Sequence, residues 1–209
     1  MEFIRTIESW WELQSILERI GFVTGIICVL LAALNIIWNW PFAIVSTGIY
    51  IFIFAKSSLY ADMGQYVYLF ISNIYGWYYW SRRPKTEKAI PIVRISKQQV
   101  IWSVLAVVIL SPSLGFMLVR LAPLLHYKPA AFPYLDSFCT VCSLIAQLFL
   151  ARKILENWLI WVFVDVIYIG VYFMKDLHLT AILFLVYTGL ALFGYIDWRK
   201  QYKKQLLPS

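Results

Sequence analysis

One acidic side chain stands inside a long apolar stretch of this chain. The stretch is NWLIWVFVDVIY, residues 157–168, and the acid is Asp165. It lies about 12 Å from the start of its span, near the centre of a ~30 Å hydrocarbon core. A charge there costs at least about 2.5–3.5 kcal/mol to insert, so such residues face a helix-bundle interior or a cavity. We interpret Asp165 as functional; the alternative is a structural carboxylate, hydrogen-bonded to neighbouring helices or kept protonated.

The residues around Asp165 indicate a class of ligand. Trp161, Asp165, Tyr168 and Tyr172 are spaced four, three and four residues apart, which places them on one helix face, and Trp158 extends that face. Aromatic rings attract a cation by about 0.5–2 kcal/mol each, and the carboxylate supplies the counter-charge. The pattern favours a flat organic cation over a neutral or anionic ligand.

Other spans add polar and aromatic candidates. Gln65 and Asn73 lie on one stripe of the span 62–80, and an amide in hydrocarbon needs hydrogen-bonding partners, which a ribose or a carboxamide can supply. Tyr187 is the polar member of the matching stripe in the span 178–197, and Trp77 is a further aromatic candidate. The predicted substrate-binding residues are Trp158, Trp161, Asp165, Tyr168, Tyr172, Gln65, Asn73, Trp77 and Tyr187.

The elements that hold these residues are predicted to be membrane-spanning helices. The 209 residues are 62% hydrophobic and only 14% charged, whereas soluble domains are about 25% charged. A stretch of about 20 apolar residues spans a bilayer as a helix. The chain has seven such stretches, at 20–38, 41–57, 62–80, 99–120, 135–151, 157–174 and 178–197. We therefore predict an all-α polytopic membrane protein.

The sequence repeats itself with a shift of 118 residues. Asn-Trp at 39–40 matches Asn-Trp at 157–158, and a Gly-x-x-x-Trp element occurs at both 76–80 and 194–198. We predict two parallel three-helix repeats joined by a linker helix, a 3+1+3 plan like that of SWEET transporters, whose substrate sites lie near the midplane between repeats. The predicted segments are 1–17 (interfacial, with Trp10, Trp11 and Leu13), 18–83 (first repeat), 84–134 (basic loop, linker helix and outer loop), 135–200 (second repeat) and 201–209 (tail).

The two copies differ in their polar residues. The shift places Thr47 opposite Asp165, so the halves share a scaffold but not a charge. This difference favours an asymmetric ligand over a symmetric channel. Asn39 and Asn157 each begin a span, and we interpret them as helix caps.

The basic residues predict an orientation in the membrane. Three segments, SRRPKTEKAIPIVRISK, ARK at 151–153 and RKQYKK at 199–204, carry twelve of the eighteen Lys and Arg residues and fall on one side of seven spans. The positive-inside rule makes that side cytoplasmic, with the N-terminus outside and the C-terminus inside. The net charge of +7 then reflects topology and contact with anionic lipid. We expect no binding to nucleic acid.

The sequence offers little support for an enzyme. Cys139 and Cys142 have C-x-x-C spacing, but no second Cys or His pair accompanies them, and Cys28 stands alone. We see no serine elbow or phosphate loop, and predict no catalytic residue, metal site or cofactor. A proton-relay enzyme or proton-coupled receptor using Asp165 is the alternative from another class, and the lack of a second buried acid nearby argues against it.

Three segments resemble the PnuC family of vitamin transporters. They are LYADMGQYVYLFISNIYGWYYWSRR, AFPYLDS and ARKILENWLIWVFVDVIYIGVYF, and the resemblance covers roughly residues 20–200. It implies uptake of nicotinamide riboside across the bacterial inner membrane by facilitated diffusion, trapping by a cytoplasmic kinase without stable contact, the three-plus-one-plus-three plan, and a homotrimer. Relatives carry thiamine or riboflavin. Thiamine, also a flat cation, is the alternative substrate, whereas neutral riboflavin fits less well.

Overall fold

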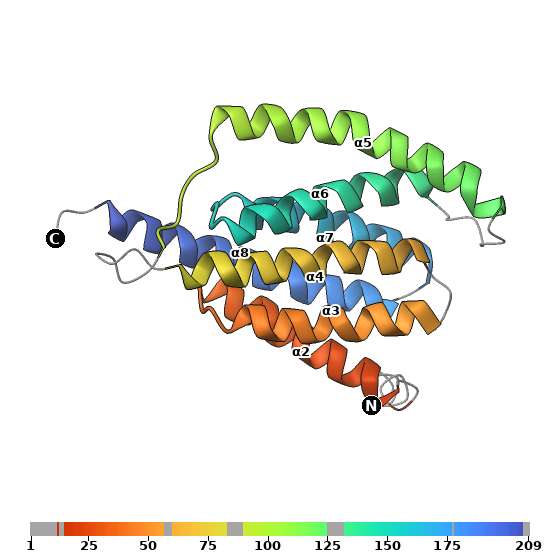
Figure 1. Cartoon of the computed structure of the whole chain (residues 1–209), viewed down its shortest axis with the longest axis horizontal. Coiled ribbons are helices and arrows are strands. Elements are labelled where there is room, and N and C mark those ends of the chain that lie inside the picture. The colour runs from red at the N-terminus through yellow and green to blue at the C-terminus, as the bar shows by residue number, and fades with distance from the viewer. Residues whose placement is uncertain are drawn as a thin grey trace.

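The computed structural model describes residues 12, 15–56, 60–82, 90–124, 132–176 and 178–206. The predicted interfacial residues Trp10, Trp11 and Leu13 lie outside this part of the chain. Successive helices run in opposite directions, so α2 begins at the end of the bundle opposite to that where α8 ends (Figure 1). The helices are α2 (Ile16–Ala33), α3 (Asn39–Lys56), α4 (Tyr60–Ser81), α5 (Lys97–Leu124), α6 (Pro133–Ala151), α7 (Asn157–Met174) and α8 (His178–Gln205).

Each of these helices overlaps one of the seven predicted spans, and the all-α prediction is confirmed. Five of them, α2, α5, α6, α7 and α8, are long and apolar enough to cross a membrane. The helices α3 and α4 lie between these in the same bundle (Figure 1). Their sequences contain Asn, Gln, Trp and Tyr residues, which lower their hydropathy. Many of these polar side chains face the interior of the bundle, as described below.

The helices α2 and α6 end in the same kind of turn. Asn35 follows α2 with a φ of 57°, and Lys153 follows α6 with a φ of 54°. The next amide in each case, that of Ile36 or Ile154, donates to a carbonyl five residues earlier, at 2.9 and 2.8 Å. A residue in the left-handed conformation with such a bond terminates a helix. The first span, predicted to run to residue 38, therefore ends at Ala33.

The prediction that Asn39 and Asn157 cap their helices is wrong. A capping side chain accepts a hydrogen bond from a backbone N–H, whereas these two side chains donate. The Nδ2 of Asn39 donates to the carbonyl of Ile36 at 2.6 Å, and that of Asn157 donates to the carbonyl of Ile154 at 2.7 Å. The left-handed turn brings each of these carbonyls within reach of the amide, so the asparagines brace the turns.

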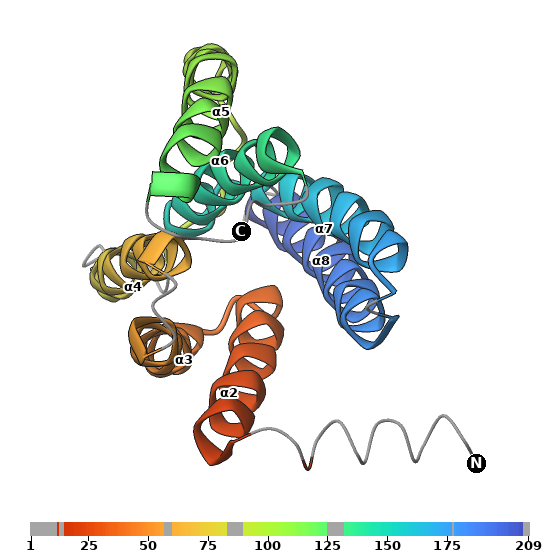
Figure 2. The same cartoon turned by 90° about the vertical axis from the view of Figure 1, so that its right-hand side faces the viewer.

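Six helices form a closed ring. Each of α2, α3, α4, α6, α7 and α8 packs against two neighbours, and the contacts of α4 with α6 and of α8 with α2 complete the circle. Figure 2, which looks along the helices, shows this arrangement, with α5 outside the ring against α6. Two of the predicted basic segments, 151–153 and 199–204, lie at the same end of the ring, where α6 ends and α8 extends beyond the bundle (Figure 1). We call this the basic end.

Two tryptophans connect the halves of the ring. Trp80, at the end of α4, donates its Nε1–H to the carbonyl of Ala151 in α6 at 3.0 Å. Trp198, the residue 118 positions later, donates to the carbonyl of Ala32 in α2, also at 3.0 Å. Their rings lie 6.0 Å apart, between centroids. Each half of the molecule therefore donates one buried hydrogen bond to the other.

Two further tryptophans explain the glycines of the repeated Gly-x-x-x-Trp element. A Cβ atom on Gly76 would lie less than 3.0 Å from ring carbons of Trp40, and a Cβ atom on Gly194 would lie 2.7 Å from the ring of Trp158. Both indoles are almost completely buried. Only glycine allows α4 and α8 to approach these rings so closely, and the two positions differ by the same 118 residues.

Candidate functional site

A central cavity of about 470 Å³ lies inside the ring and is lined by residues of all six ring helices. Eight of the nine predicted site residues line it together, although they come from three helices. Its predicted members are Gln65 and Asn73 from α4, Trp158, Trp161, Asp165, Tyr168 and Tyr172 from α7, and Tyr187 from α8.

Trp77 is the predicted site residue that does not line the central cavity, and its side chain is 44% exposed. The inward face of α4 runs through Gln65, Leu69 and Asn73, which do line the cavity. Because a helix has 3.6 residues per turn, the next position on that face is Gly76. Gly76 packs against Trp40, and Trp77 is turned away from the cavity.

Asp165 is the only acidic residue among the described residues that line the central cavity. It is 5% exposed. No hydrogen bond or ion pair joins it to another residue within the described part of the chain. One form of the structural alternative, a carboxylate hydrogen-bonded to neighbouring helices, is therefore not found among the described residues. Its hydrogen-bonding capacity is therefore available to a ligand or to water.

A chain of hydrogen-bonded amides occupies the opposite wall. The Nε2 of Gln147, in α6, donates to the Oδ1 of Asn73 at 2.7 Å, and the Nδ2 of Asn73 approaches the Oγ1 of Thr47 at 3.4 Å. Thr47 in turn donates to the carbonyl of Ala43 at 2.7 Å. Sequence reasoning missed Gln147, although it carries the signal used for Gln65 and Asn73, an amide within an apolar span.

Aromatic rings form the wall beside Asp165. Tyr168 and Tyr172 from α7 pack against Phe184 from α8, with ring centroids 5.1 and 5.2 Å apart. Tyr187 makes an edge contact with Phe184 at 6.1 Å. Phe184 was not predicted, because an isolated phenylalanine in an apolar span carries no signal in the sequence. An aromatic ring has an electron-rich face, which attracts a cation, and an electropositive edge.

The indoles of Trp40 and Trp158 face the central cavity near its other end. Their buried Nε1–H groups have no hydrogen-bond partner within the described part of the chain. A buried donor without a partner costs about 1–3 kcal/mol, so a ligand oxygen or a water that accepts from it is favoured. Trp40 was not among the predicted site residues, although its match with Trp158 in the repeat could have identified it.

The charges of the lining define what the cavity can bind. Besides the carboxyl group of Asp165, the described lining contains amides, hydroxyl groups, one thiol and aromatic rings, and none of these residues is Lys, Arg or His. Such a lining stabilises a cation beside Asp165 and offers hydrogen bonds to hydroxyl and amide groups. It offers no counter-charge to a phosphate.

Comparisons with known proteins bear on the whole chain. A family model described as "Nicotinamide mononucleotide transporter" matches residues 15–200. The chain belongs to this family. The resemblance seen in the sequence is thereby confirmed, and the chain is a multi-pass membrane protein of a transporter family.

Individual members of the family and a solved structure are similar to it as well. A relative from Escherichia coli (strain K12), "Nicotinamide riboside transporter PnuC", is 30% identical and the match covers 87% of this chain and 84% of the relative. A "Riboflavin/roseoflavin transporter RibM" from Streptomyces davaonensis is 25% identical, with 87% and 83% covered. The crystal structure of a "Vitamin B3 transporter PnuC" shares the fold, with a TM-score of 0.68, 22% identity, and 96% and 88% covered.

Proposed function

We propose that this protein transports nicotinamide riboside through the central cavity. The proposal rests on Asp165, which is the one acid of an aromatic cavity and has no bonded partner among the described residues, while the described lining holds no basic residue. Nicotinamide riboside has a flat cationic pyridinium ring, a carboxamide and a ribose. The pyridinium matches the carboxylate and the aromatic wall, and the E. coli relative is named for this substrate.

The rest of the substrate matches the other groups of the cavity. A carboxamide and ribose hydroxyl groups both donate and accept hydrogen bonds. Gln65 and the unpartnered Nε1–H groups of Trp40 and Trp158 offer complementary groups in the same cavity. Asn73 and Gln147 already bond to each other, so we propose that they mainly shape the wall of the cavity. Each still has a donor or an acceptor that can bond to the ligand.

The compound in the family description and the compound in the name of the E. coli relative differ by one phosphate group. The family model is described by nicotinamide mononucleotide, which carries a phosphate that nicotinamide riboside lacks. A buried phosphate needs Lys, Arg or backbone donors to offset its charge, and the described lining has no Lys or Arg and already contains a carboxylate. The geometry therefore favours the riboside, and we expect the mononucleotide to compete poorly.

The remaining features are also proposals. We propose facilitated diffusion, because the described lining holds one acid and no Lys, Arg or His, which gives no evident proton or sodium relay. Trapping of the product by a cytoplasmic kinase, a homotrimer and the bacterial inner membrane follow from the family resemblance. The cytoplasmic placement of the basic end and of the C-terminus follows from the positive-inside rule. The 3+1+3 plan is supported by the contacts that recur 118 residues apart.

The decisive experiment is uptake of labelled nicotinamide riboside by proteoliposomes that contain the purified protein. We expect saturable uptake that stops at equal concentrations inside and outside. Asp165→Asn keeps the size of the side chain but removes its charge, and should weaken binding by about 1–3 kcal/mol, or roughly 5- to 150-fold. Asp176→Asn is the matched control, because it is the same change at an exposed acid just beyond α7.

Other outcomes would reject parts of the proposal. Unchanged binding in Asp165→Asn would show that the charge of Asp165 does not contribute to ligand binding. Saturable uptake of thiamine without uptake of nicotinamide riboside would assign the transporter to that second cation. Accumulation above the outside concentration under an imposed ion gradient would rule out facilitated diffusion.

A further inference from the structure

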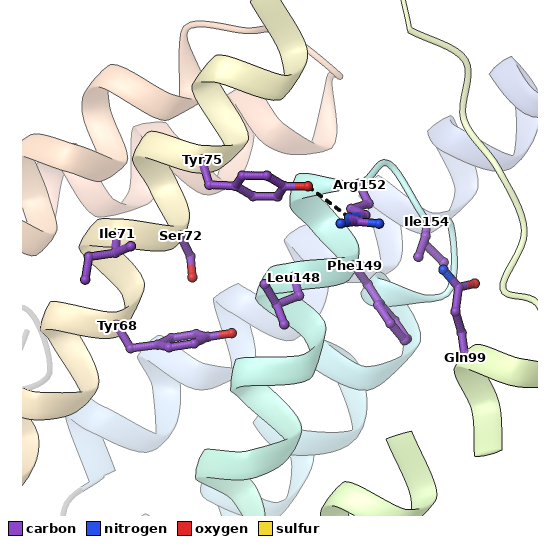
Figure 3. A pocket seen from close by; sticks show the side chains of 9 residues that line it. All are labelled: Tyr68, Ile71, Ser72, Tyr75, Gln99, Leu148, Phe149, Arg152 and Ile154. Carbon is purple, nitrogen blue, oxygen red and sulfur yellow. Dashed lines mark hydrogen bonds between the residues drawn. The ribbon is translucent and has the colours of Figure 1, made fainter. Parts of the chain in front are cut away.

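A second cavity, which we call the outer groove, lies outside the ring. It has a volume of about 560 Å³ and shares no lining residue with the central cavity. Figure 3 shows its walls, which come from α4, α6, the turn after α6 and the start of α5. The lining residues are Tyr68, Ile71, Ser72, Tyr75, Gln99, Leu148, Phe149, Arg152 and Ile154.

The outer groove is apolar along its length. Ile71, Leu148 and Phe149 supply aliphatic and aromatic surface. The hydroxyl group of Tyr68 already donates a hydrogen bond to the carbonyl of Leu144, at 3.2 Å. Along α4 the lining extends over seven residues, from Tyr68 to Tyr75, which is about 10 Å. In a bilayer such a surface is covered by a hydrocarbon chain or by protein.

One end of the outer groove is cationic and polar. The Nε of Arg152 donates to the hydroxyl oxygen of Tyr75 at 2.9 Å, and its two terminal NH₂ groups form no hydrogen bond within the described part of the chain. Gln99 accepts from the backbone N–H of Ser96 at 2.8 Å through Oε1, so its NH₂ group is left to donate. Figure 3 shows Arg152 and Gln99 at the same end of the groove.

No acid among the described lining residues balances Arg152. The closest acid along the chain, Glu156, is engaged elsewhere: it forms an ion pair with Arg94 and accepts from the backbone N–H of Ile95 at 2.8 Å. The groove end therefore keeps an uncompensated guanidinium, whose planar donors match a phosphate. An ammonium headgroup would find no carboxylate there.

We propose that the outer groove binds an anionic phospholipid of the surrounding bilayer. One acyl chain lies along Leu148 and Ile71, and the phosphodiester accepts hydrogen bonds from Arg152 and Gln99. Basic pockets between transmembrane helices are a known way to hold anionic headgroups. Because the groove is bounded by α4, α6 and α5, and α5 lies outside the ring, the lipid also connects the linker helix to the ring.

The test is lipid binding to the delipidated full-length protein in neutral detergent, measured by native mass spectrometry and by the thermal midpoint. Dioleoyl phosphatidylglycerol should bind several-fold more tightly than dioleoyl phosphatidylcholine and should raise the midpoint more. Arg152→Gln should weaken phosphatidylglycerol binding roughly tenfold. Arg82→Gln is the matched control, because Arg82 also lies against a tyrosine, 4.3 Å from the ring centroid of Tyr78, but does not line the groove.

Further arms identify the source of the ligand. Dihexanoyl phosphatidylglycerol should bind much more weakly than the dioleoyl lipid, and millimolar inorganic phosphate should not displace the latter. If Arg152→Gln folds poorly, Arg152→Lys, which keeps the charge, should retain most of the preference for phosphatidylglycerol.

Three results would overturn the proposal. Equal binding of the two dioleoyl lipids, or an unchanged affinity in Arg152→Gln, would show that Arg152 does not hold an anionic headgroup. Displacement by inorganic phosphate would show a free-anion site. Disulfide crosslinking between copies through Ile71→Cys, or through Leu148→Cys, would show that a second copy covers the groove.

Discussion

The half of the ring built from α2–α4 and the half built from α6–α8 are alike in their packing. Three aromatic rings meet in each half. In the first half, Tyr50 and Phe54 lie 5.2 and 5.1 Å from Tyr66. In the second half, Tyr168 and Tyr172, at the positions 118 residues later, lie 5.1 and 5.2 Å from Phe184. The apolar scaffold is therefore duplicated almost contact by contact.

The polar residues of the two halves are not duplicated. In the first half, Asn73 bonds both to Thr47 and to Gln147 of α6. The equivalent positions, 118 residues away, hold Asp165, Ala191 and Val29. The second site thus keeps a carboxylate but has lost both amides that could have satisfied it. The two halves thus have similar backbones but different polar contacts. The polar side chains of the first half hydrogen-bond to one another, whereas Asp165 in the second half is available to a ligand.

The largest expected effects test whether the duplicated packing is equally tight in both halves. Gly76→Ala and Gly194→Ala each force a methyl group into the ring of Trp40 or Trp158. Overpacking of this kind costs about 1–3 kcal/mol. Both variants should lower the free energy of unfolding by similar amounts, measured as thermal midpoints in detergent.

The controls for this pair are glycines in the same two helices. A Cβ atom on Gly64 in α4 or on Gly189 in α8 meets no heavy atom within 4 Å. Alanine there should be neutral or slightly stabilising, because it restricts the unfolded chain. A strong loss in only one of Gly76→Ala and Gly194→Ala would show that the two halves are packed differently.

A smaller effect is expected from the satisfied polar wall. Gln147→Leu leaves the Oδ1 of Asn73 without its donor at 2.7 Å, and an unsatisfied buried acceptor costs about 1–2 kcal/mol. Val29→Leu places the same residue at the equivalent position, where no hydrogen bond is lost, and should cost less. Equal losses of thermal stability in the two variants would mean that the amide chain contributes only volume.

The two cross-ring hydrogen bonds should contribute about equally. Trp80→Phe removes the donor to Ala151, and Trp198→Phe removes the donor to Ala32. Each should cost about 0.5–1.5 kcal/mol for the hydrogen bond, read as a drop in thermal midpoint. Since the two rings are neighbours, the double variant should differ from the sum of the single ones. An additive result would contradict a coupled pair.

The smallest effect is expected where only one half has an ion pair. Glu156 bonds to Arg94 and to the amide of Ile95, whereas the equivalent position holds Trp38, which is 64% exposed. The hydrogen bond and charge of Glu156 raise the pKa of Arg94. A cation with a raised pKa loses its contribution only as the pH rises through that pKa, so the pair should contribute equally from neutral to mildly alkaline pH.

Glu156→Gln should therefore change the thermal midpoint only slightly, and the change should shrink further as salt is added, because exposed ion pairs are screened. A large loss that is insensitive to salt would show that the bond to Ile95, and not the charge, holds the segment before α5 in place.

Much of the site could be predicted because the relevant signals are local. Composition indicates a membrane, and a charge within an apolar span must face protein or water. The 3.6-residue period then places Trp161, Tyr168 and Tyr172 on the face of Asp165, and all of them line the central cavity. The seven helices follow from the apolar stretches in the same way.

The sequence by itself thus determined the membrane environment, the helices and the residues that share a face with Asp165. The tertiary structure decided which faces meet: it turned Trp77 away from the central cavity, brought Gln147 to Asn73, and gave Asp165 no hydrogen-bond or ion-pair partner among the described residues. It also opened the outer groove between α4 and α6. The physical reason is that helical periodicity acts over a few residues, whereas the order in which the ring closes depends on packing between helices far apart in the chain.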